Sequence, residues 1–420
     1  MRITLAGIVY LVVSILILVY SLAHMNGLLY AFALSLMLIF YYEYINFKSI
    51  EKASADIYIE KNIAKHFCHE LESVAIELKI RNRSKIGIPR IYIEEVLPRF
   101  LEIVDGKNRY MVSLPSESEL VIKYKVKVKA PGIHPIGETR IILSDSLNFF
   151  VLTSMHNTKD SIVALPLALE VQKSFKSIRR LLGIKTLGKS IGGLYDLANI
   201  RDYVYGDDVR KILWKIYAKR GKLMIREDYG ETQVKVLVLI DMRDYLWNIG
   251  SEPNTLAHIQ LRLARSIIEA LLKSRSIIDA AICGGAIPKI VRDLHASPLE
   301  SMYQLFSVLE PGKGCEVTFL EYSRLYRYLG RDLLEYDEII LITNPISIAL
   351  EDPKRIEELV SLSSNRLSIY IPRFNYEQFI KKTELTALLS AISRLLERGG
   401  RGLYIIDEDF SIIYKTREKS

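Results

Sequence analysis

The sequence has few cysteines, and its two longest apolar stretches contain no charged residue. The chain of 420 residues includes three cysteines, Cys68, Cys283 and Cys315, which lie far apart. An odd, scattered set of this kind excludes a disulfide framework and favours a reducing compartment. The apolar content is not low. Half of the residues (50%) are apolar, which excludes a largely disordered chain. The length predicts two or three domains.

Metal-binding clusters are also scarce. His66, Cys68 and His69 lie close together, but no second ligand pair follows at the spacing of a zinc site. We therefore expect no metal there, with a metal site as the alternative. The formal net charge of +8 fits anionic lipid, nucleic acid or the topology of a membrane protein.

Two apolar stretches stand at the N-terminus, Ile3–Ala23 and Leu28–Tyr42. The first is long enough to cross about 30 Å of hydrocarbon, and the second is just long enough with its tyrosine flank. A cleaved signal peptide is the alternative for the first, but no cleavage site followed by polar sequence appears. Basic residues, Arg2 before the pair and Lys48 after it, predict that both ends face the cytoplasm. We expect residues 1–46 to form a transmembrane hairpin in the cell membrane, with the soluble domains on the cytoplasmic side.

Residues 47–166 show a period of two that is typical of antiparallel strands. In Leu120–Lys129, apolar residues alternate with a row of lysines, which indicates one buried and one solvated face. Similar runs occur at Ser73–Ile80, Ile88–Val96, Gly137–Leu143 and Ser161–Leu165. Short strands at this spacing predict an all-β, immunoglobulin-like sandwich. The lysine row is interpreted as a solvated strand face, with contact to lipid headgroups or nucleic acid as the alternative.

Residues 231–420 alternate between apolar runs and helical periodicity. Strands are expected at Val234–Ile240, Ile277–Cys283, Glu338–Thr343, Arg366–Ile371 and Gly402–Ile406. Helices are expected at Thr255–Lys273, Pro298–Leu309, Glu321–Leu334, Pro353–Leu362 and Glu377–Arg398. This alternation predicts a doubly wound α/β domain with a parallel sheet. Ligands of such sheets bind at the carboxyl ends of the strands.

Residues 167–230 form a linker that contains the most chemically varied stretch of the chain, Arg201–Glu227. A Gly-Asp-Asp turn there is flanked by basic and aromatic residues. Internal ion pairs or a partner-facing surface are the favoured interpretation. An acid–base pair formed by Asp207 and Asp208, and a surface that stacks on nucleic acid, are the alternatives.

The linker also contains a phosphate-loop pattern, Gly183–Ser190, which matches G-x-x-x-x-G-K-S. That motif works only between a buried strand and a helix that aims its N–H groups at the phosphates. A basic, helix-like run precedes it and Gly192-Gly193 follow it, so we interpret it as a flexible connector.

The Arg201–Glu227 stretch resembles the family of membrane proteins labelled domain of unknown function 58. Its hallmark R-x-Y-x-x-G-D-D-x-R-x-I-x-W is matched by Arg201, Tyr203, Gly206, Asp207, Asp208, Arg210, Ile212 and Trp214. The chain departs from the pattern at Leu213, where members usually carry Asp or Asn, and at Lys219, usually Arg. Upstream, Pro131-Gly132-Ile133 and Asp145–Phe150 are similar to the family's strand and turn lead-in, with Ala130 and Ser146 as departures.

The resemblance implies a von Willebrand factor A-like fold for residues 231–420. In that fold the first strand ends in D-x-S-x-S, which holds magnesium with help from later loops. This chain has Asp241 and Asp244, but Arg243 and Tyr245 replace the serines, and Asn344 stands where a later aspartate is expected. A cation among the ligands opposes a hard metal, so we expect a metal-free scaffold in which Arg243 pairs with a carboxylate. A magnesium ion held by Asp241 and Asp244 alone is the alternative.

The expected function is that of a membrane-anchored, non-enzymatic scaffold or adaptor without a cofactor. The resemblance implies work beside MoxR-type AAA+ ATPases in assembling or remodelling membrane-associated complexes. The expected partner-binding residues are Arg201, Tyr203, Gly206, Asp207, Asp208, Arg210 and Trp214. Two alternatives are a hydrolytic or nucleotide-dependent enzyme and a membrane-tethered protein that binds nucleic acid.

Overall fold

A computed structural model of the chain describes residues 1–168, 197–204, 209, 212–228, 234–273, 276–285, 287–294, 297–315, 319, 327, 329, 333–363, 366–399, 402–407 and 412–415. Two compact units result. The first comprises Met1–Leu167 and Phe306–Pro311, and the second comprises Ala168–Leu305 and Gly312–Ser420.

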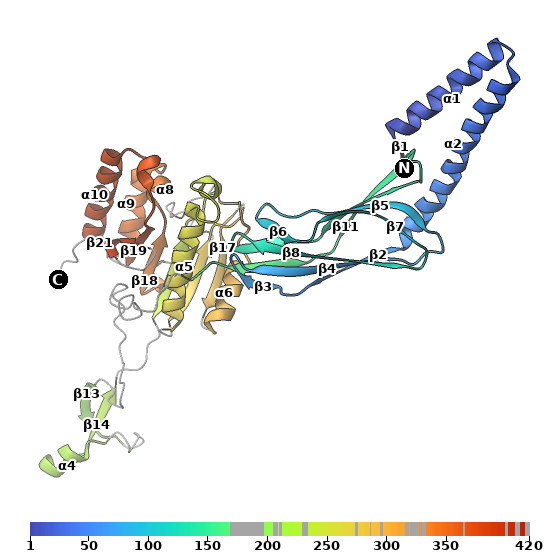
Figure 1. Cartoon of the computed structure of the whole chain (residues 1–420). Coiled ribbons are helices and arrows are strands. Elements are labelled where there is room, and N and C mark those ends of the chain that lie inside the picture. The colour runs from blue at the N-terminus through green and yellow to red at the C-terminus, as the bar shows by residue number, and fades with distance from the viewer. Residues whose placement is uncertain are drawn as a thin grey trace. The chain divides into compact units, whose positions relative to one another are not determined.

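The first unit begins with two long apolar helices, α1 (Leu5–Ala23) and α2 (Gly27–Ala53), which form a hairpin (Figure 1). The Asn26 side chain caps α2 by accepting hydrogen bonds from the N–H groups of Leu28 and Leu29. Both helices are long and apolar enough to cross a membrane. The two predicted stretches are therefore confirmed as apolar helices, and α2 runs past the second stretch to Ala53.

Three sheets follow the hairpin, after a short 3-10 turn η1 (Ser54–Asp56). The five-stranded sheet β1–β11–β10–β5–β7 consists of β1 (Arg2–Ile3), β5 (Ile88–Glu95), β7 (Arg109–Leu114), β10 (Glu138–Ser144) and β11 (Phe150–Asn157). The four-stranded sheet β2–β4–β8–β6 consists of β2 (Ile57–Ile63), β4 (Ser73–Asn82), β6 (Leu101–Asp105) and β8 (Glu119–Val128). The small sheet β3–β12–β9 consists of β3 (Phe67–His69), β9 (Gly132–Pro135) and β12 (Ser161–Leu165).

The period of two in the sequence matches the burial of the strands. On β8, Ile122, Tyr124 and Val126 enter a core that they share with side chains of β4, β5 and β10 and with Phe47 of α2. The predicted strands correspond to β4, β5, β8, β10 and β12, whereas β1, β2, β3, β6, β7, β9 and β11 were not predicted as separate strands. Apolar side chains of both larger sheets thus form one core, as the alternation requires.

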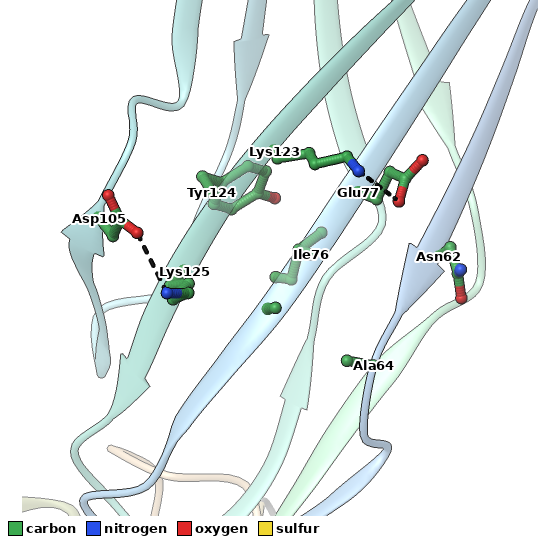
Figure 2. A pocket seen from close by; sticks show the side chains of 9 residues that line it. Asn62, Ala64, Ile76, Glu77, Asp105, Lys123, Tyr124 and Lys125 are labelled. Carbon is green, nitrogen blue, oxygen red and sulfur yellow. Dashed lines mark ion pairs between the residues drawn. The ribbon is translucent and has the colours of Figure 1, made fainter.

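The lysine row of β8 lies beside carboxylates on the neighbouring strands. Figure 2 shows two of these ion pairs around a shallow groove of about 290 Å³. The nitrogen–oxygen distances are 3.6 Å for Lys123–Glu77, 3.2 Å for Lys125–Asp105 and 3.0 Å for Lys129–Glu102. Positive charge on this face is therefore matched by negative charge, which fits a solvated strand face better than a basic nucleic-acid surface.

The turn that begins at Asp145 holds the helical hairpin against the strands. Its carboxylate accepts hydrogen bonds from three backbone N–H groups, including those of Phe149 (3.1 Å) and Phe150 (2.7 Å). The two phenyl rings then contact the helices, at 4.6 Å between the Phe149 and Tyr10 rings and 5.2 Å between the Phe150 and Phe40 rings. The lead-in motif of the sequence is therefore a packing element at the base of α1 and α2.

A close backbone approach explains Gly132, at the start of β9. Its φ of +119° lies in the left-handed region, and a Cβ at this position would lie 2.6 Å from the Leu309 carbonyl oxygen. The next residue, Ile133, donates its N–H to that same carbonyl at 2.8 Å. Only glycine allows this contact, which joins Phe306–Pro311 to the first unit.

Beside this contact, His134 is buried as a neutral imidazole, with Nε2 donating to the Ala130 carbonyl at 2.7 Å. Burial lowers the pKa of His134 from 6.5 to about 4. The unfolded state therefore binds a proton more readily than the folded state between these values, and stability falls as the pH falls through this range. We expect a loss of up to about 3 kcal/mol for the first unit.

Amide hydrogen exchange of β9 and β12, corrected for intrinsic rates, measures this loss between pH 7 and pH 4.5. Carboxylates titrate in the same window, so the prediction concerns the difference between variants. His134→Gln should flatten the pH dependence, while His66→Gln, at an exposed position, should leave it unchanged. Equal pH dependence in the wild type and His134→Gln would contradict the assignment.

The second unit contains a seven-stranded sheet of order β17–β16–β15–β18–β19–β20–β21. Its strands are β15 (Lys235–Ile240), β16 (Ile277–Ile282), β17 (Lys289–Leu294), β18 (Glu338–Ile342), β19 (Leu367–Pro372), β20 (Gly402–Ile406) and β21 (Ile412–Lys415). The five central strands are parallel, as predicted. The edge strands β17 and β21, which were not predicted, are antiparallel to their neighbours. Short connections to β16 and β20 permit this, whereas a parallel neighbour needs a long crossover.

The helical elements of this unit are η3 (Asp244–Asn248), α5 (Leu256–Lys273), α6 (Pro298–Phe306), η4 (Leu333–Glu335), α8 (Pro345–Ala349), α9 (Pro353–Leu362), η5 (Tyr376–Gln378) and α10 (Lys382–Gly399). The predicted helix Glu377–Arg398 is divided into η5 and α10. At the start of η5, the Tyr376 hydroxyl donates a hydrogen bond to the Pro372 carbonyl at 2.7 Å. The predicted helix Glu321–Leu334 lies mostly outside the described residues.

Candidate functional site

The strand order of the second unit defines where a ligand would bind. The chain passes from β15 to β16 on one side and returns to β18 on the other, so the order reverses at β15. Crevices outside the carboxyl ends of strands at such a reversal are the usual ligand sites of doubly wound sheets. Asp241 follows β15 and Thr343 follows β18, with Ile240 and Ile342 in register. These two residues therefore lie at the switch point.

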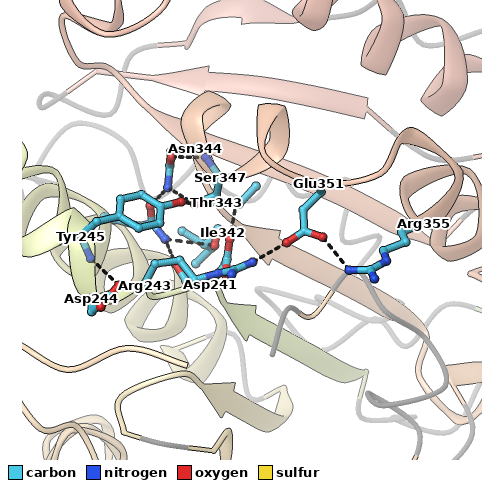
Figure 3. Close-up of polar contacts among 11 residues, drawn as sticks. Asp241, Arg243, Asp244, Tyr245, Ile342, Thr343, Asn344, Ser347, Glu351 and Arg355 are labelled. Carbon is cyan, nitrogen blue, oxygen red and sulfur yellow. Dashed lines mark hydrogen bonds and ion pairs between the residues drawn. The ribbon is translucent and has the colours of Figure 1, made fainter. Parts of the chain in front are cut away.

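Asp241 is buried at this point, and both of its carboxylate oxygens have partners (Figure 3). The Thr343 hydroxyl donates to Oδ2 at 2.9 Å, and Nε of Arg243 donates to Oδ1 at 3.3 Å. Burial raises the pKa of Asp241, while the Arg243 guanidinium beside it acts in the opposite direction. The carboxylate is thus held by groups of its own domain.

Arg243 joins Asp241 to a second carboxylate that is distant in the sequence. Its Nη2 lies 2.6 Å from Oε1 of Glu351, which follows α8. The other oxygen of Glu351 accepts a hydrogen bond from Arg355 at 3.0 Å (Figure 3). Burial lowers the pKa of Arg243, but the Asp241 and Glu351 carboxylates outweigh this and raise it overall. The side chain therefore carries a fixed positive charge between two carboxylates.

Asn344, at the position where an aspartate is expected, caps α8. Its Oδ1 accepts from the N–H of Ser347 at 2.9 Å, and its Nδ2 donates to Oε1 of Gln260 at 3.1 Å. Gln260 of α5 in turn donates to the main-chain carbonyl of Asp241. The side chain at this position must both donate and accept a hydrogen bond. The Asn344 amide can do both, whereas an ionised carboxylate can only accept.

The remaining two positions of the motif also contact protein groups. The Tyr245 hydroxyl lies 3.0 Å from the Ser347 hydroxyl, and burial raises the pKa of Tyr245. Asp244 is exposed at the start of η3, and its Oδ1 accepts from the N–H of Tyr245 at 2.7 Å. Asp244 therefore does not join Asp241 in a common cluster.

These residues do not fit a magnesium ion. Nε of Arg243 lies 3.3 Å from Oδ1 of Asp241, so a divalent cation bound to this carboxylate would have a positive charge beside it, and like charges repel. Among the described residues, no group of three or more His, Cys, Asp or Glu side chains could hold a metal ion. Sequence reasoning singled out Asp241 and Arg243, but not Glu351, Gln260 or Thr343. The position of Thr343 as the last residue of a predicted strand was a usable signal.

The signature segment forms a small strand pair with one helix, insofar as the structure describes it. β13 (Leu197–Asp202) pairs antiparallel with β14 (Met224–Asp228), and α4 (Trp214–Arg220) lies between them in the sequence. Arg201 lies in β13, and Tyr203, just beyond it, donates its N–H to the Leu223 carbonyl at 3.0 Å. Gly206, Asp207, Asp208 and Arg210 lie outside the described residues.

Trp214 begins α4 with 57% of its surface exposed, and its ring meets the Tyr217 ring edge-on at 6.2 Å between centroids. Ile212 and Ile225 are buried beside it. The described part of the segment therefore has a small apolar interior and an exposed aromatic pair.

The other sequence motifs are only partly described. Cys68 is buried in β3, whereas His66 is exposed and donates Nδ1–H to the Ser161 carbonyl at 3.2 Å. The phosphate-loop pattern Gly183–Ser190 lies outside the described residues.

Solved structures resemble parts of the chain only weakly. The cupredoxin domain of amoB from Nitrosocaldus yellowstonii is 11% identical, with a TM-score of 0.20, over 27% of this chain and 88% of its own. A CARDB domain from Pyrococcus furiosus is 16% identical, with a TM-score of 0.18, over 26% and 92%. A non-cellulosomal cohesin from Archaeoglobus fulgidus is 12% identical, with a TM-score of 0.17, over 26% and 91%. Scores this low support no inference about this chain.

The comparison with curated proteins finds no significant match. A family match covers residues 199–289, with the family described as protein of unknown function DUF58. The matched range contains the strand pair β13–β14, helix α4 and the first strands of the seven-stranded sheet, up to the start of β17. Residues 199–289 therefore match the family that the signature block resembles, which supports that part of the prediction.

Proposed function

We propose that this protein is a membrane-anchored, non-enzymatic scaffold or adaptor of the cell membrane, with its soluble parts on the cytoplasmic side. The apolar helices α1 and α2 supply the anchor, and Arg2 and Lys48 on its two ends support this orientation. The aromatic contacts of Phe149 and Phe150 with the hairpin favour a rigid connection between the anchor and the β-strands.

The proposal includes two finer fold assignments. Two sheets that share one core support an immunoglobulin-like sandwich for the first unit. In chain order, the strands of the seven-stranded sheet run 3-2-1-4-5-6-7, which extends the doubly wound order 3-2-1-4-5-6 by one edge strand and supports a von Willebrand factor A-like domain. The antiparallel edge strand β17 is compatible with the doubly wound order and with the von Willebrand factor A-like assignment.

The observation that carries the proposal is the exposed aromatic pair of the signature segment. A tryptophan that leaves 57% of its surface in water, beside an exposed tyrosine and several Lys and Arg side chains, is typical of a protein-binding surface. Trp214 is also one of the seven predicted partner-binding residues. The Arg243 bridge adds support, because it holds the Asp241 and Glu351 carboxylates in ion pairs and leaves neither of these two as a free acid or base.

The proposed partner is a MoxR-type AAA+ ATPase, on the strength of the family resemblance. Affinity capture of the full-length protein in mild detergent from its own cells, followed by mass spectrometry, tests this. We expect the wild type to recover an AAA+ ATPase, and expect both Trp214→Ala and the double variant Asp207→Ala/Arg210→Ala to lose at least about tenfold of it, as truncation of a central interface residue would.

Leu350→Ala is the matched control, because Leu350 is an exposed apolar side chain elsewhere in the second unit. It should recover the ATPase as the wild type does, and circular dichroism should show all variants folded. An ATPase that persists with the folded Trp214→Ala variant would mean that the segment is not the docking surface. Failure to recover any AAA+ ATPase with the wild type would remove the proposed partner.

A further inference from the structure

Two buried cysteines meet beside the Arg243 bridge. Cys283 directly follows β16, and its N–H donates to the Ile240 carbonyl at 3.3 Å. The N–H of Cys315 donates to the Met242 carbonyl at 3.1 Å. Carbonyls two residues apart in an extended chain point to the same side, about 7 Å apart. Cys283 and Cys315 therefore dock at consecutive positions along one edge of the same segment.

The two thiols lie close enough to influence one another. Burial, and then the neighbouring Cys315 thiol, raises the pKa of Cys283. Backbone positions about 7 Å apart lie at the upper limit for a disulfide, so closing the bond draws the two segments slightly together. Both cysteines are buried, with Cys283 0% and Cys315 3% exposed, so Cys315 is the less enclosed of the two.

The residues just before Cys315 contact Arg243, Asp244 and Trp247 at the candidate site. The indole Nε1 of Trp247 donates to the Lys313 carbonyl at 3.1 Å. At Gly314, a Cβ would lie 2.2 Å from the N of Asp244 and 2.5 Å from the Cα of Arg243, so the backbones are in direct contact. A disulfide between Cys283 and Cys315 would link the residues before Cys315 covalently to the end of β16.

We propose that Cys283 and Cys315 form a redox modification site that takes a peroxide as its oxidant and closes to a disulfide. The Cys315 thiol gives up its proton, and the resulting thiolate attacks one peroxide oxygen, which breaks the O–O bond and leaves a sulfenic acid on Cys315. The departing hydroxide takes up the proton that the thiol released and leaves as water. Cys283 then attacks the sulfenic sulfur, and a second water leaves with the thiol proton. In total, two thiols and one hydrogen peroxide give one disulfide and two waters.

The disulfide ties β16 to the segment that contacts Arg243 and Asp244. Oxidation therefore restrains the residues that follow β15, and reduction releases them. This step stands apart from the adaptor proposal, because its readout requires no partner.

The test treats purified full-length protein in detergent with hydrogen peroxide, beside glutathione as an accessible reference thiol. Remaining thiols are blocked with N-ethylmaleimide and the protein is digested without reduction for mass spectrometry. We expect a mass loss of about 2 Da and a linked pair of peptides containing Cys283 and Cys315. Cys68, which lies in the other unit, is the internal control and should be recovered as the blocked thiol.

Thermal unfolding supplies the second readout. The linkage should raise the Tm of the second unit by on the order of 10 °C, and the rise should disappear in Cys283→Ser and in Cys315→Ser. The proposal is overturned if both thiols remain alkylatable after the glutathione is fully oxidised, or if Cys315 gains two oxygens without a link. The mass measurement on the wild type needs no variant to fold.

Discussion

Glu95→Ala should destabilise the first unit by about 3–5 kcal/mol, the largest effect that we expect from a single substitution. Nζ of Lys61 lies 2.6 Å from Oε2 of Glu95, and their side chains are 0% and 2% exposed. Removing the carboxylate would leave the ammonium group of Lys61 buried without its partner charge. The Tyr124 hydroxyl, which donates to Glu95 at 3.2 Å, would also lose its acceptor.

The same carboxylate connects the two larger sheets. Lys61 and Tyr124 belong to the sheet β2–β4–β8–β6, whereas Glu95 and its donor Thr139 belong to the sheet that contains β5 and β10. Glu95→Gln should cost less than Glu95→Ala, because the amide keeps an acceptor for Tyr124 while it removes the charge.

Amide hydrogen exchange of β4, β5 and β8 measures the effect, since both tryptophans of the chain lie in the second unit. Glu119→Ala is the control. Glu119 pairs with Arg81 at 2.7 Å on the exposed surface, where such pairs contribute less than about 1 kcal/mol. Equal protection in Glu95→Ala and Glu119→Ala would show that the buried pair does not stabilise the fold.

Arg243→Ala should destabilise the second unit by about 3 kcal/mol. The substitution leaves buried Asp241 and Glu351 without the guanidinium that joins them. We expect the lower end of the range for a broken buried pair, because Glu351 keeps Arg355 at 3.0 Å and Asp241 keeps the Thr343 hydroxyl at 2.9 Å.

Trp247 is a suitable reporter, because it is buried in η3, directly after the site. In a Trp214→Phe background it is the single tryptophan, so urea unfolding followed by its fluorescence reports this unit. Arg355→Ala is the matched control. It removes a half-exposed arginine from the same carboxylate and should cost less than about 1 kcal/mol. A loss for Arg243→Ala no larger than for this control would contradict the bridging role.

The sequence predicted those features that depend on local periodicity. The alternation in Leu120–Lys129 placed one face of β8 in the core, and the apolar run Val234–Ile240 placed Asp241 at the end of a central strand. The antiparallel edge strand Lys289–Leu294 was missed, because three of its six residues are charged and it has no regular alternation. Edge strands tolerate such sequences, and their pairing depends on the neighbouring strand.

The contacts of the candidate site depend on tertiary structure and could not be predicted in the same way. The expectation that Arg243 pairs with a neighbouring carboxylate agrees with the structure, but Glu351 lies 108 positions away and no local pattern pointed to it. Asn344 was noticed as a departure from an acidic position, whereas its two-sided role between Ser347 and Gln260 appears only when the strands are in register.

Binding of Mn²⁺ to the purified protein is the most direct test of the claim that the Arg243 guanidinium takes the place of a metal. Electron paramagnetic resonance distinguishes free from bound Mn²⁺, and Mn²⁺ accepts the same oxygen ligands as Mg²⁺. We predict that the wild type leaves the Mn²⁺ signal unchanged at millimolar ion, and that Arg243→Ser, which restores a D-x-S sequence, binds one ion through Asp241. One Mn²⁺ bound by the wild type and lost in Asp241→Asn would contradict the claim.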